Sequence, residues 1–306
     1  MSIDITEINY GINSDPSGFI HQADSHYHTR LREIACDIAE NRTKRPVILL
    51  SGPSGSGKTT TALMIEKILD DMGIQTHTLS MDNYFCSLTD EEKALMAEGK
   101  IDLESPLRVD SEFLSAQLED IYNCRPVELP RYDFETSSRA FTGTVFERKQ
   151  GELVILEGIH ALNPDVITLP DEETAKIYVS VRTRITSGEL TLHPSKIRLM
   201  RRLVRDLKFR KRALRETINM FASVEEGENK YIMPYKYRST YDVDTFMPYE
   251  VCAYRQALFS DLSAITDEDV ICDAMTVLSS TAPLSFDLIP PESLICEFIG
   301  NGQFTY

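Results

Sequence analysis

The strongest constraint on this chain is a glycine-rich segment that lies between an apolar run and a helix-like stretch. Residues 51–60 read Ser-Gly-Pro-Ser-Gly-Ser-Gly-Lys-Thr-Thr and match the pattern G-x-x-x-x-G-K-[ST]. Four aliphatic residues at 47–50 precede the segment, and residues 61–69 carry a helical pattern of apolar side chains. A strand, a loop and a helix in this order form the setting that a phosphate-binding loop requires. The segment therefore predicts a site for the phosphate tail of a nucleotide.

Each part of this segment suits phosphate binding. Its glycines let the backbone curl so that several N–H groups converge on the phosphate oxygens. A helix that begins near Lys58 adds the positive end of its dipole, and the Lys58 ammonium adds a charge for the outer phosphates. The Thr59 hydroxyl can ligate Mg²⁺. We expect the nucleotide to be bound by Gly52, Pro53, Ser54, Gly55, Ser56, Gly57, Lys58, Thr59 and Thr60.

Composition limits the classes of partner. The chain has 306 residues, 42% of them hydrophobic, which is enough for one principal domain with a sizeable core. Its net charge of −16 opposes general binding to nucleic acid or to an anionic membrane. The six cysteines form no C-x-x-C pair, a pattern typical of reduced thiols, and no apolar run approaches the length of a membrane span. We expect a cytoplasmic protein with a local anion site.

Two carboxylates follow predicted strands. Residues 75–81 have the length and composition of a strand and lead into Asp82, and residues 151–158 read as a buried strand that ends in Glu157. The carboxyl ends of parallel strands meet at the ligand-binding edge of a sheet, where a kinase needs a carboxylate to orient the attacking hydroxyl. An isolated Asp before Asn is otherwise typical of a turn. We expect Asp82 to be catalytic, and Glu157 to face the Mg²⁺ site.

The most basic segment of the chain is 196–215. Leu199, Leu203 and Leu207 recur every fourth residue and predict an amphipathic helix. Such a charge run is often a solvated surface. Because the rest of the chain is acidic, we expect instead a mobile lid whose arginines contact the triphosphate. The arginines assigned to this lid are Arg198, Arg202, Arg205, Arg210 and Arg212.

The remaining segments are less informative. Residues 1–20 read as an irregular lead-in, followed by one helix at 21–41. Three histidines near that helix have no spacing typical of a metal site. The aromatic and polar residues at 129–139 indicate a binding loop or a hairpin. We divide the chain into an N-terminal extension at 1–44, a kinase domain at 45–282 with a lid at about 185–240, and a tail at 283–306.

Several segments together resemble the uridine kinase and phosphoribulokinase family of phosphate-loop kinases. They occur in the order of that family and cover roughly residues 45 to 262. Residues 249–250 and 297–300 resemble a uridine kinase-like subgroup that is often fused to a synthetase-like amino-terminal region. The resemblance implies an α/β fold of the P-loop NTPase type, with three α/β/α layers, a mostly parallel central sheet and a helical arginine-bearing lid. The segments are 52–60, 80–85, 132–134 with Ser138 and Arg139, 156–159, and 201–206 with Arg210 and Arg212.

The resemblance also assigns roles. It implies that Asp82 is the general base, that Thr59, Asp82 and Glu157 surround Mg²⁺, and that Lys58 and the lid arginines, with Arg205 in catalysis, hold the phosphates. Glu104 stands where uridine kinases carry an Asp that holds ribose hydroxyls, and Ser137 stands where they carry a His that contacts the pyrimidine. Losing that ring removes a group that discriminates between bases. The residues expected on the acceptor side are Tyr84, Glu104, Tyr132, Ser137 and Arg139.

The function expected from these features is transfer of a phosphoryl group from ATP, with Mg²⁺, to a hydroxyl of a nucleoside. One alternative is a kinase of a non-nucleoside alcohol, such as a sugar phosphate or a pantothenate-like compound, because one scaffold serves several acceptors. Another is a nucleotide-binding regulator. The acceptor, its base, donors other than ATP, homo-oligomer formation and the role of residues 1–44 stay open at this point.

Overall fold

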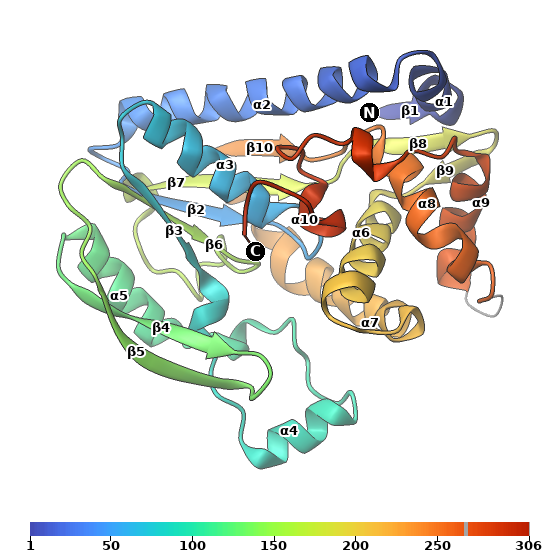
Figure 1. The fold of residues 1–306 in the computed structure, drawn as a ribbon. Helices are drawn as coiled ribbons and strands as arrows, with labels where there is room; N and C mark the ends of the chain where they lie inside the picture. The colour runs from blue at the N-terminus through green and yellow to red at the C-terminus, as the bar shows by residue number, and fades with distance from the viewer. Residues whose placement is uncertain (266–268, 306) are drawn as a thin grey trace.

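The core of the molecule is a five-stranded sheet in which all strands are parallel (Figure 1). The computed structural model describes residues 1–265 and 269–305. The strands β2 and β6 lie at the centre, and every residue of both is buried. Runs of aliphatic residues without alternation are typical of parallel strands that are covered on both faces. The strand order is β10 (Tyr241–Asp244), β7 (Thr174–Ser180), β2 (Val47–Ser51), β6 (Leu153–Glu157), β3 (Thr76–Ser80).

Helices pack on both faces of this sheet, and alternate side chains of β2 divide between the two layers. Ile48 and Leu50 join a cluster with α2 (Pro16–Asn41) and α3 (Lys58–Asp71). Val47 and Leu49 join another cluster, which contains α5 (Ser111–Tyr122). Because successive side chains of a strand point to opposite faces, the two clusters are the two interlayer cores. The three-layer α/β/α fold predicted from the sequence is confirmed.

The N-terminal residues are helical, so the prediction of an irregular lead-in at 1–20 is wrong. Helix α1 (Ile5–Ser14) is capped by the Asp4 side chain, and α2 begins at Pro16 after a cap by Asp15. Gly11 lies against the Phe19 ring, which is 2.5 Å from where a Cβ would stand. The glycines and the Asp-Pro pair therefore mark a tight junction between two helices rather than loose chain.

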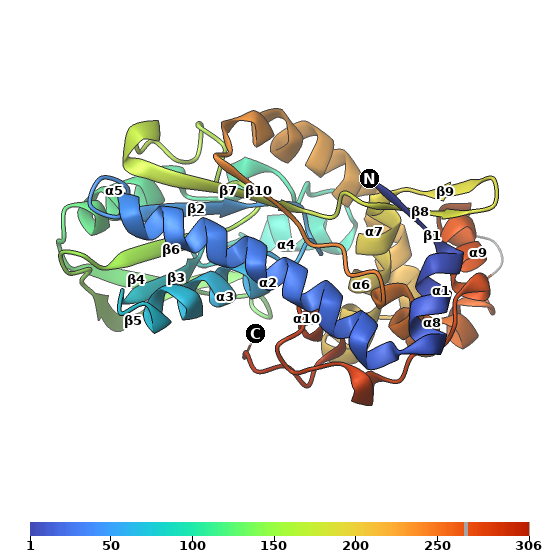
Figure 2. The same ribbon diagram turned by 90° about the horizontal axis from the view of Figure 1, so that it is seen from above.

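The first residues of the chain belong to a second, smaller sheet. Strand β1 (Ser2–Asp4) pairs in parallel with β8 (Arg184–Ser187), and β8 pairs antiparallel with β9 (Leu190–Leu192). This hairpin lies in the chain directly before the basic segment 196–215. Helix α2 then runs above α3 and the sheet-edge strand β10, as Figures 1 and 2 show.

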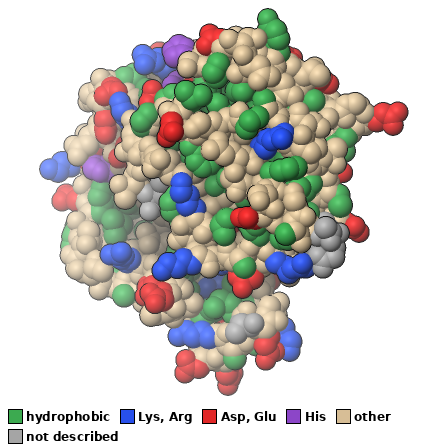
Figure 3. All heavy atoms as spheres, turned by 45° about the vertical axis from the view of Figure 1, so that its right-hand side comes forward, with side chains coloured by type: hydrophobic (Ala, Val, Ile, Leu, Met, Phe, Trp, Pro, Cys, Tyr) green, Lys and Arg blue, Asp and Glu red, His purple; other side chains and the backbone are tan. Residues whose placement is uncertain are grey.

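The other elements lie beyond the edges of the central sheet. The hairpin β4–β5 and α4 extend from the β3 edge of the sheet. Helices α6 to α10 form a group on the side of the sheet to which the central strands point (Figure 1). Charged side chains of both signs are scattered over the face shown in Figure 3. The bounds are α4 (Asp90–Ala97), β4 (Val127–Asp133), β5 (Ser138–Phe146), α6 (Pro194–Phe209), α7 (Leu214–Gly227), α8 (Glu250–Leu262), α9 (Cys272–Ser280) and α10 (Cys296–Ile299).

Candidate active site

The glycine-rich loop joins the carboxyl end of β2 to the first turn of α3. Gly55 and Gly57 have φ angles of 75° and 85°, a region that favours glycine. At Gly52 a Cβ would stand 2.0 Å from the carbonyl oxygen of Val179, so only glycine fits there. Gly57 is the N-cap residue of α3, so the cap position itself offers no side chain to the first-turn N–H groups of the helix. This is the backbone arrangement that phosphate oxygens require.

Lys58 lies at the centre of the charges around this loop. Its Nζ donates to the carbonyl oxygen of Pro53 at 3.3 Å. Burial raises the pKa of both Asp82 and Glu157, and the positive charge of Lys58 opposes that rise, so the ammonium is within electrostatic reach of both carboxylates. The structure therefore brings together three residues that are far apart in the sequence.

The two carboxylates lie at neighbouring strand ends. Asp82 lies in a 3-10 turn (Met81–Tyr84) directly after β3, and Glu157 is the last residue of β6. Burial raises the pKa of Asp82, against the opposing charges of Lys58 and Arg210. Burial is the main cause that raises the pKa of Glu157 to about 7; the positive charge of Lys58 opposes this rise, and the negative charge of Asp82 adds to it.

These acidic groups suit a divalent cation. The negative charge of Asp82 raises the pKa of Glu157, so a positive charge between the two carboxylates would stabilise both, and Mg²⁺ prefers oxygen ligands. Asp82, Glu157 and the hydroxyl of Thr59 at the start of α3 offer oxygen atoms of the kind that Mg²⁺ prefers. Over residues 1–265 and 269–305, no group of three or more His, Cys, Asp or Glu residues is arranged to hold a metal by itself.

The arginines assigned to the predicted lid divide into two groups. Arg202 donates to the Ser54 hydroxyl at 2.5 Å, and Arg198 donates to the Ser54 carbonyl at 3.1 Å, so both contact the glycine-rich loop. Three other arginines converge instead on the carboxylate of Asp206. This second group contains Arg205, Arg210 and Arg212, at 2.8 to 3.5 Å. The charge of Arg210 nevertheless reaches Asp82, whose pKa it lowers.

Glu104 lies between the loop arginines and α7. Burial raises its pKa, while Arg202 and Lys58 lower it. At Gly227, the last residue of α7, a Cβ would stand 2.3 Å from the Cβ of Glu104, so glycine permits this close approach. In the part of the chain that the structure describes, the buried Oε2 of Glu104 has no hydrogen-bond partner. A polar group from a bound molecule could satisfy it.

Three of the other residues expected on the acceptor side meet at the β4–β5 hairpin, where Arg139 is the register partner of Tyr132 and donates to the Tyr84 carbonyl at 3.5 Å. The Tyr84 hydroxyl donates to Gln117 Oε1 at 2.8 Å, inside the core next to α5. Arg139 donates to Asp110 at 2.8 Å, and Ser137 lies in the β4–β5 turn with φ 52°. Tyr132 accepts from Arg108 at 3.2 Å. Residues 131–135 line a hollow of about 460 Å³ beside this hairpin.

Two residues near the site were given no chemical role by the sequence interpretation. His160 is buried three residues after Glu157, and burial lowers its pKa to about 4, so the ring is neutral at pH 7. Glu297, in α10, accepts hydrogen bonds through Oε2 from the Thr60 N–H at 3.2 Å and the Thr60 hydroxyl at 2.8 Å. Thr60 and Glu297 are 237 positions apart in the sequence, so no local pattern could have predicted this contact.

The fold and this loop define an ATP-dependent kinase of the P-loop class. The phosphate loop follows the central strand, and acidic residues end two neighbouring strands of a parallel sheet. Among the described residues, no helix is long and apolar enough to cross a membrane.

Comparisons with known proteins agree with this class. The family model described as the phosphoribulokinase / uridine kinase family matches residues 47–246, and the chain belongs to this family. A uridine kinase from Staphylococcus haemolyticus is 34% identical over 194 residues, which cover 62% of this chain and 83% of that protein. A uridine kinase from Lactobacillus helveticus is 33% identical over 64% of this chain and 84% of that protein. A solved structure described as a possible uridine kinase from Bacillus stearothermophilus has 19% identity and a TM-score of 0.46, and covers 71% of this chain and 98% of that one.

Proposed function

We propose that this kinase transfers the γ-phosphoryl group of ATP to a hydroxyl of a nucleoside. The observation that carries the proposal is the convergence of Lys58, Asp82 and Glu157 at one edge of the sheet, beside the glycine-rich loop. The relatives named uridine kinase support a nucleoside as the acceptor. The cytoplasmic location expected from the cysteines stays a prediction.

In the proposed reaction, the acceptor hydroxyl oxygen attacks the γ-phosphorus in line with the leaving group. The bond from the γ-phosphorus to the bridging oxygen breaks, and ADP leaves with that electron pair. Asp82 accepts the hydroxyl proton, for which the burial that raises its pKa is favourable. Lys58 and the arginines of α6 offset the charge on the phosphate oxygens. Mg²⁺, held by Thr59, Asp82 and Glu157, would neutralise further phosphate charge.

The acceptor side of the proposed site is formed around Glu104. Its unpartnered, buried carboxylate oxygen is suited to a hydroxyl donor such as those of a ribose. Ser137 stands where uridine kinases carry the histidine that contacts the pyrimidine. Its positive φ and its place in the β4–β5 turn indicate a role in forming the turn rather than in recognising a base. This departure keeps a non-nucleoside alcohol as the second candidate acceptor.

A panel assay tests the proposal. ADP release is measured with ATP, Mg²⁺ and single acceptors drawn from ribonucleosides, sugar phosphates and pantothenate-like alcohols. We expect release that depends on a ribonucleoside and is abolished by a chelator of Mg²⁺. Dependence on one of the other alcohols would select the second candidate. Slow hydrolysis that no acceptor changes would contradict both and favour a nucleotide-binding regulator.

A further inference from the structure

The C-terminal segment 293–300 packs directly on the phosphate loop and the start of α3. Leu294 lies against Gly57, where a Cβ would stand 3.0 Å from the Leu294 side chain. Helix α10, within this segment, lies beside α6 and near α3 (Figure 1). The segment therefore contacts both elements that surround the predicted donor phosphates.

Glu297 occupies a phosphate-binding position of the loop. Thr60 is the third residue of α3, and N–H groups in a first helical turn lack partners within the helix. In a phosphate-binding loop these N–H groups hold the α- and β-phosphates. Here one oxygen, Oε2 of Glu297, accepts from both the N–H and the hydroxyl of Thr60. The carboxylate thus stands where an anionic phosphate oxygen would.

The segment that carries Glu297 is anchored rather than loosely placed. Phe298 is fully buried, and its ring lies 5.1 Å from the Arg201 guanidinium. Arg201 in turn donates to the Gly55 carbonyl of the loop at 3.2 Å. Lys208 of α6 donates to the Ile299 carbonyl at 2.5 Å. The position of the Glu297 carboxylate is therefore coupled to α6 and to the loop itself.

A carboxylate and a phosphate cannot share these donors, because both are anions and both need the same hydrogen atoms. We propose that segment 293–300 is an intramolecular competitor of the donor nucleotide, with Glu297 holding the α-phosphate position until the nucleotide displaces it. The inference rests on the proposed function, in which the donor binds in this loop. As a consequence, the apparent affinity of the free enzyme for the donor is lower than it would be without the competitor. The affinity is reduced by the fraction of molecules in which Glu297 leaves the position open.

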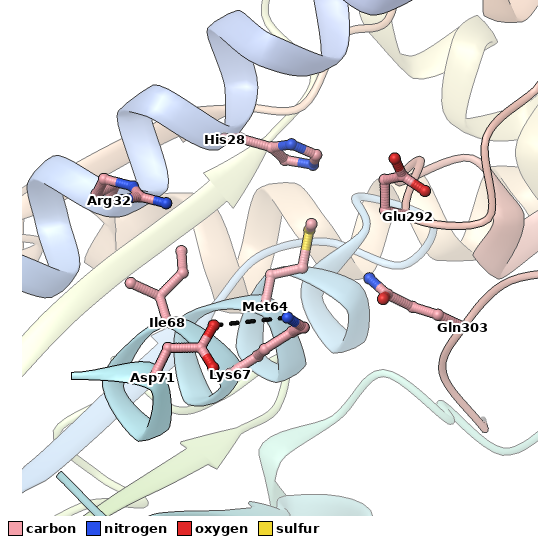
Figure 4. A pocket seen from close by; sticks show the side chains of 8 residues that line it. All are labelled: His28, Arg32, Met64, Lys67, Ile68, Asp71, Glu292 and Gln303. Carbon is pink, nitrogen blue, oxygen red and sulfur yellow. Dashed lines mark ion pairs between the residues drawn. The ribbon is translucent and has the colours of Figure 1, made fainter. Parts of the chain in front are cut away.

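A second carboxylate in the same tail provides the matched control. Glu292 borders a cavity of about 330 Å³ between α2, α3 and the tail, where Gln303 and His28 also lie (Figure 4). Lys67 and Asp71 form an ion pair at its floor on α3. Replacing Glu292 removes one negative charge from the tail but leaves the contacts of Thr60 in place.

The test compares the Kd of ATP with Mg²⁺, by calorimetry, for the wild-type chain, Glu297→Gln and Glu292→Gln. The neutral amide competes less well, so Glu297→Gln is expected to bind ATP about tenfold more tightly, with Glu292→Gln within about twofold of wild type. Hydrogen exchange on the wild-type chain provides a readout without any substitution. Saturating ATP is expected to increase amide exchange over residues 294–300.

The outcomes separate the two proposals. Equal or weaker ATP binding by Glu297→Gln, or exchange at 294–300 that ATP leaves unchanged or slows, overturns the competitor role while the kinase assignment stands. Absence of ATP binding to the wild-type chain and to Glu297→Gln alike would overturn the donor assignment and the competitor role with it. Detectable binding only in Glu297→Gln supports the inference.

Discussion

The hydroxyl of Ser80 donates a hydrogen bond of 3.2 Å to Oε1 of Glu157. The two residues are also direct partners in the register of β3 and β6. This bond joins the last residues of β3 and β6, so the turn that carries Asp82 starts beside the Glu157 carboxylate. The relative position of the two acids is therefore set by the sheet rather than by a loop.

Replacing Asp82 by Asn tests its proposed role as the base. Asn keeps the shape of the side chain but cannot accept the proton, so we expect turnover to fall by at least about 100-fold while ATP still binds. Steady-state kinetics and ATP calorimetry measure the two effects. Asp90→Asn, in α4, is the control for an exposed carboxylate. Wild-type turnover in Asp82→Asn would remove this residue from the mechanism.

Glu104→Gln tests acceptor binding. The amide keeps the length of the side chain but loses the charge that a hydroxyl donor would meet, so we expect the acceptor KM to rise by about tenfold and the Kd of ATP to stay close to wild type. The exposed Glu91 offers a control in Glu91→Gln. An unchanged acceptor KM would place the acceptor elsewhere.

Arg205→Ala tests the proposed lid. Arg205 pairs with Asp206 in this structure, so its proposed role belongs to the closed complex with both substrates bound. We expect kcat to fall by about tenfold to 100-fold and ATP affinity to change less. Lys211→Gln, in the exposed turn after α6, is the control. Equal losses in kcat and in ATP affinity would contradict a role specific to the closed complex.

The stability of the N-terminal helix should depend on pH through Asp24. Burial raises the pKa of Asp24 to about 6, although the hydrogen bond from the Tyr249 hydroxyl lowers it. A carboxyl with a raised pKa in the folded state favours folding at low pH, and this contribution is lost as the pH rises through about 6. The loss is on the order of 3 kcal/mol for a shift of about two units.

Asp24→Asn should remove this dependence. We expect its unfolding free energy, measured with urea, to vary less between pH 4 and 7 than that of the wild-type chain. Asp261→Asn, an exposed control, should keep the wild-type profile. Identical profiles for Asp24→Asn and the wild-type chain would show that Asp24 does not titrate in this way.

The central elements of the fold could be predicted because their signals are local. The strand predicted at 75–81 is β3 at Thr76–Ser80, and the strand predicted at 151–158 is β6 at Leu153–Glu157. The glycine-rich loop between β2 and α3 is similarly encoded within a few residues. The roles assigned to the site residues stay predictions.

Contacts between distant segments could not be predicted from these patterns. Arg201 belongs to the basic segment, yet it is fully buried in an ion pair with Glu250, 49 positions later. The contact between Thr60 and Glu297 likewise joins residues that are far apart in the sequence. In residues 1–20, Gly11 and Gly18 weakened the helical pattern of the sequence. In the structure, Gly11 allows the close approach of the Phe19 ring, and Gly18 allows that of the Asp15 side chain. Composition alone does not distinguish such a glycine from one in loose chain.

The pairing of β1 with β8 has a consequence for biosynthesis. Ser2 is the register partner of Arg184, so the first strand has no partner until the ribosome has made more than half of the chain. Contacts of such long sequence separation form late and slow the search for the native state. Residues 2–4 therefore stay unpaired until the hairpin that receives them has been made, and a chaperone could bind them in this interval.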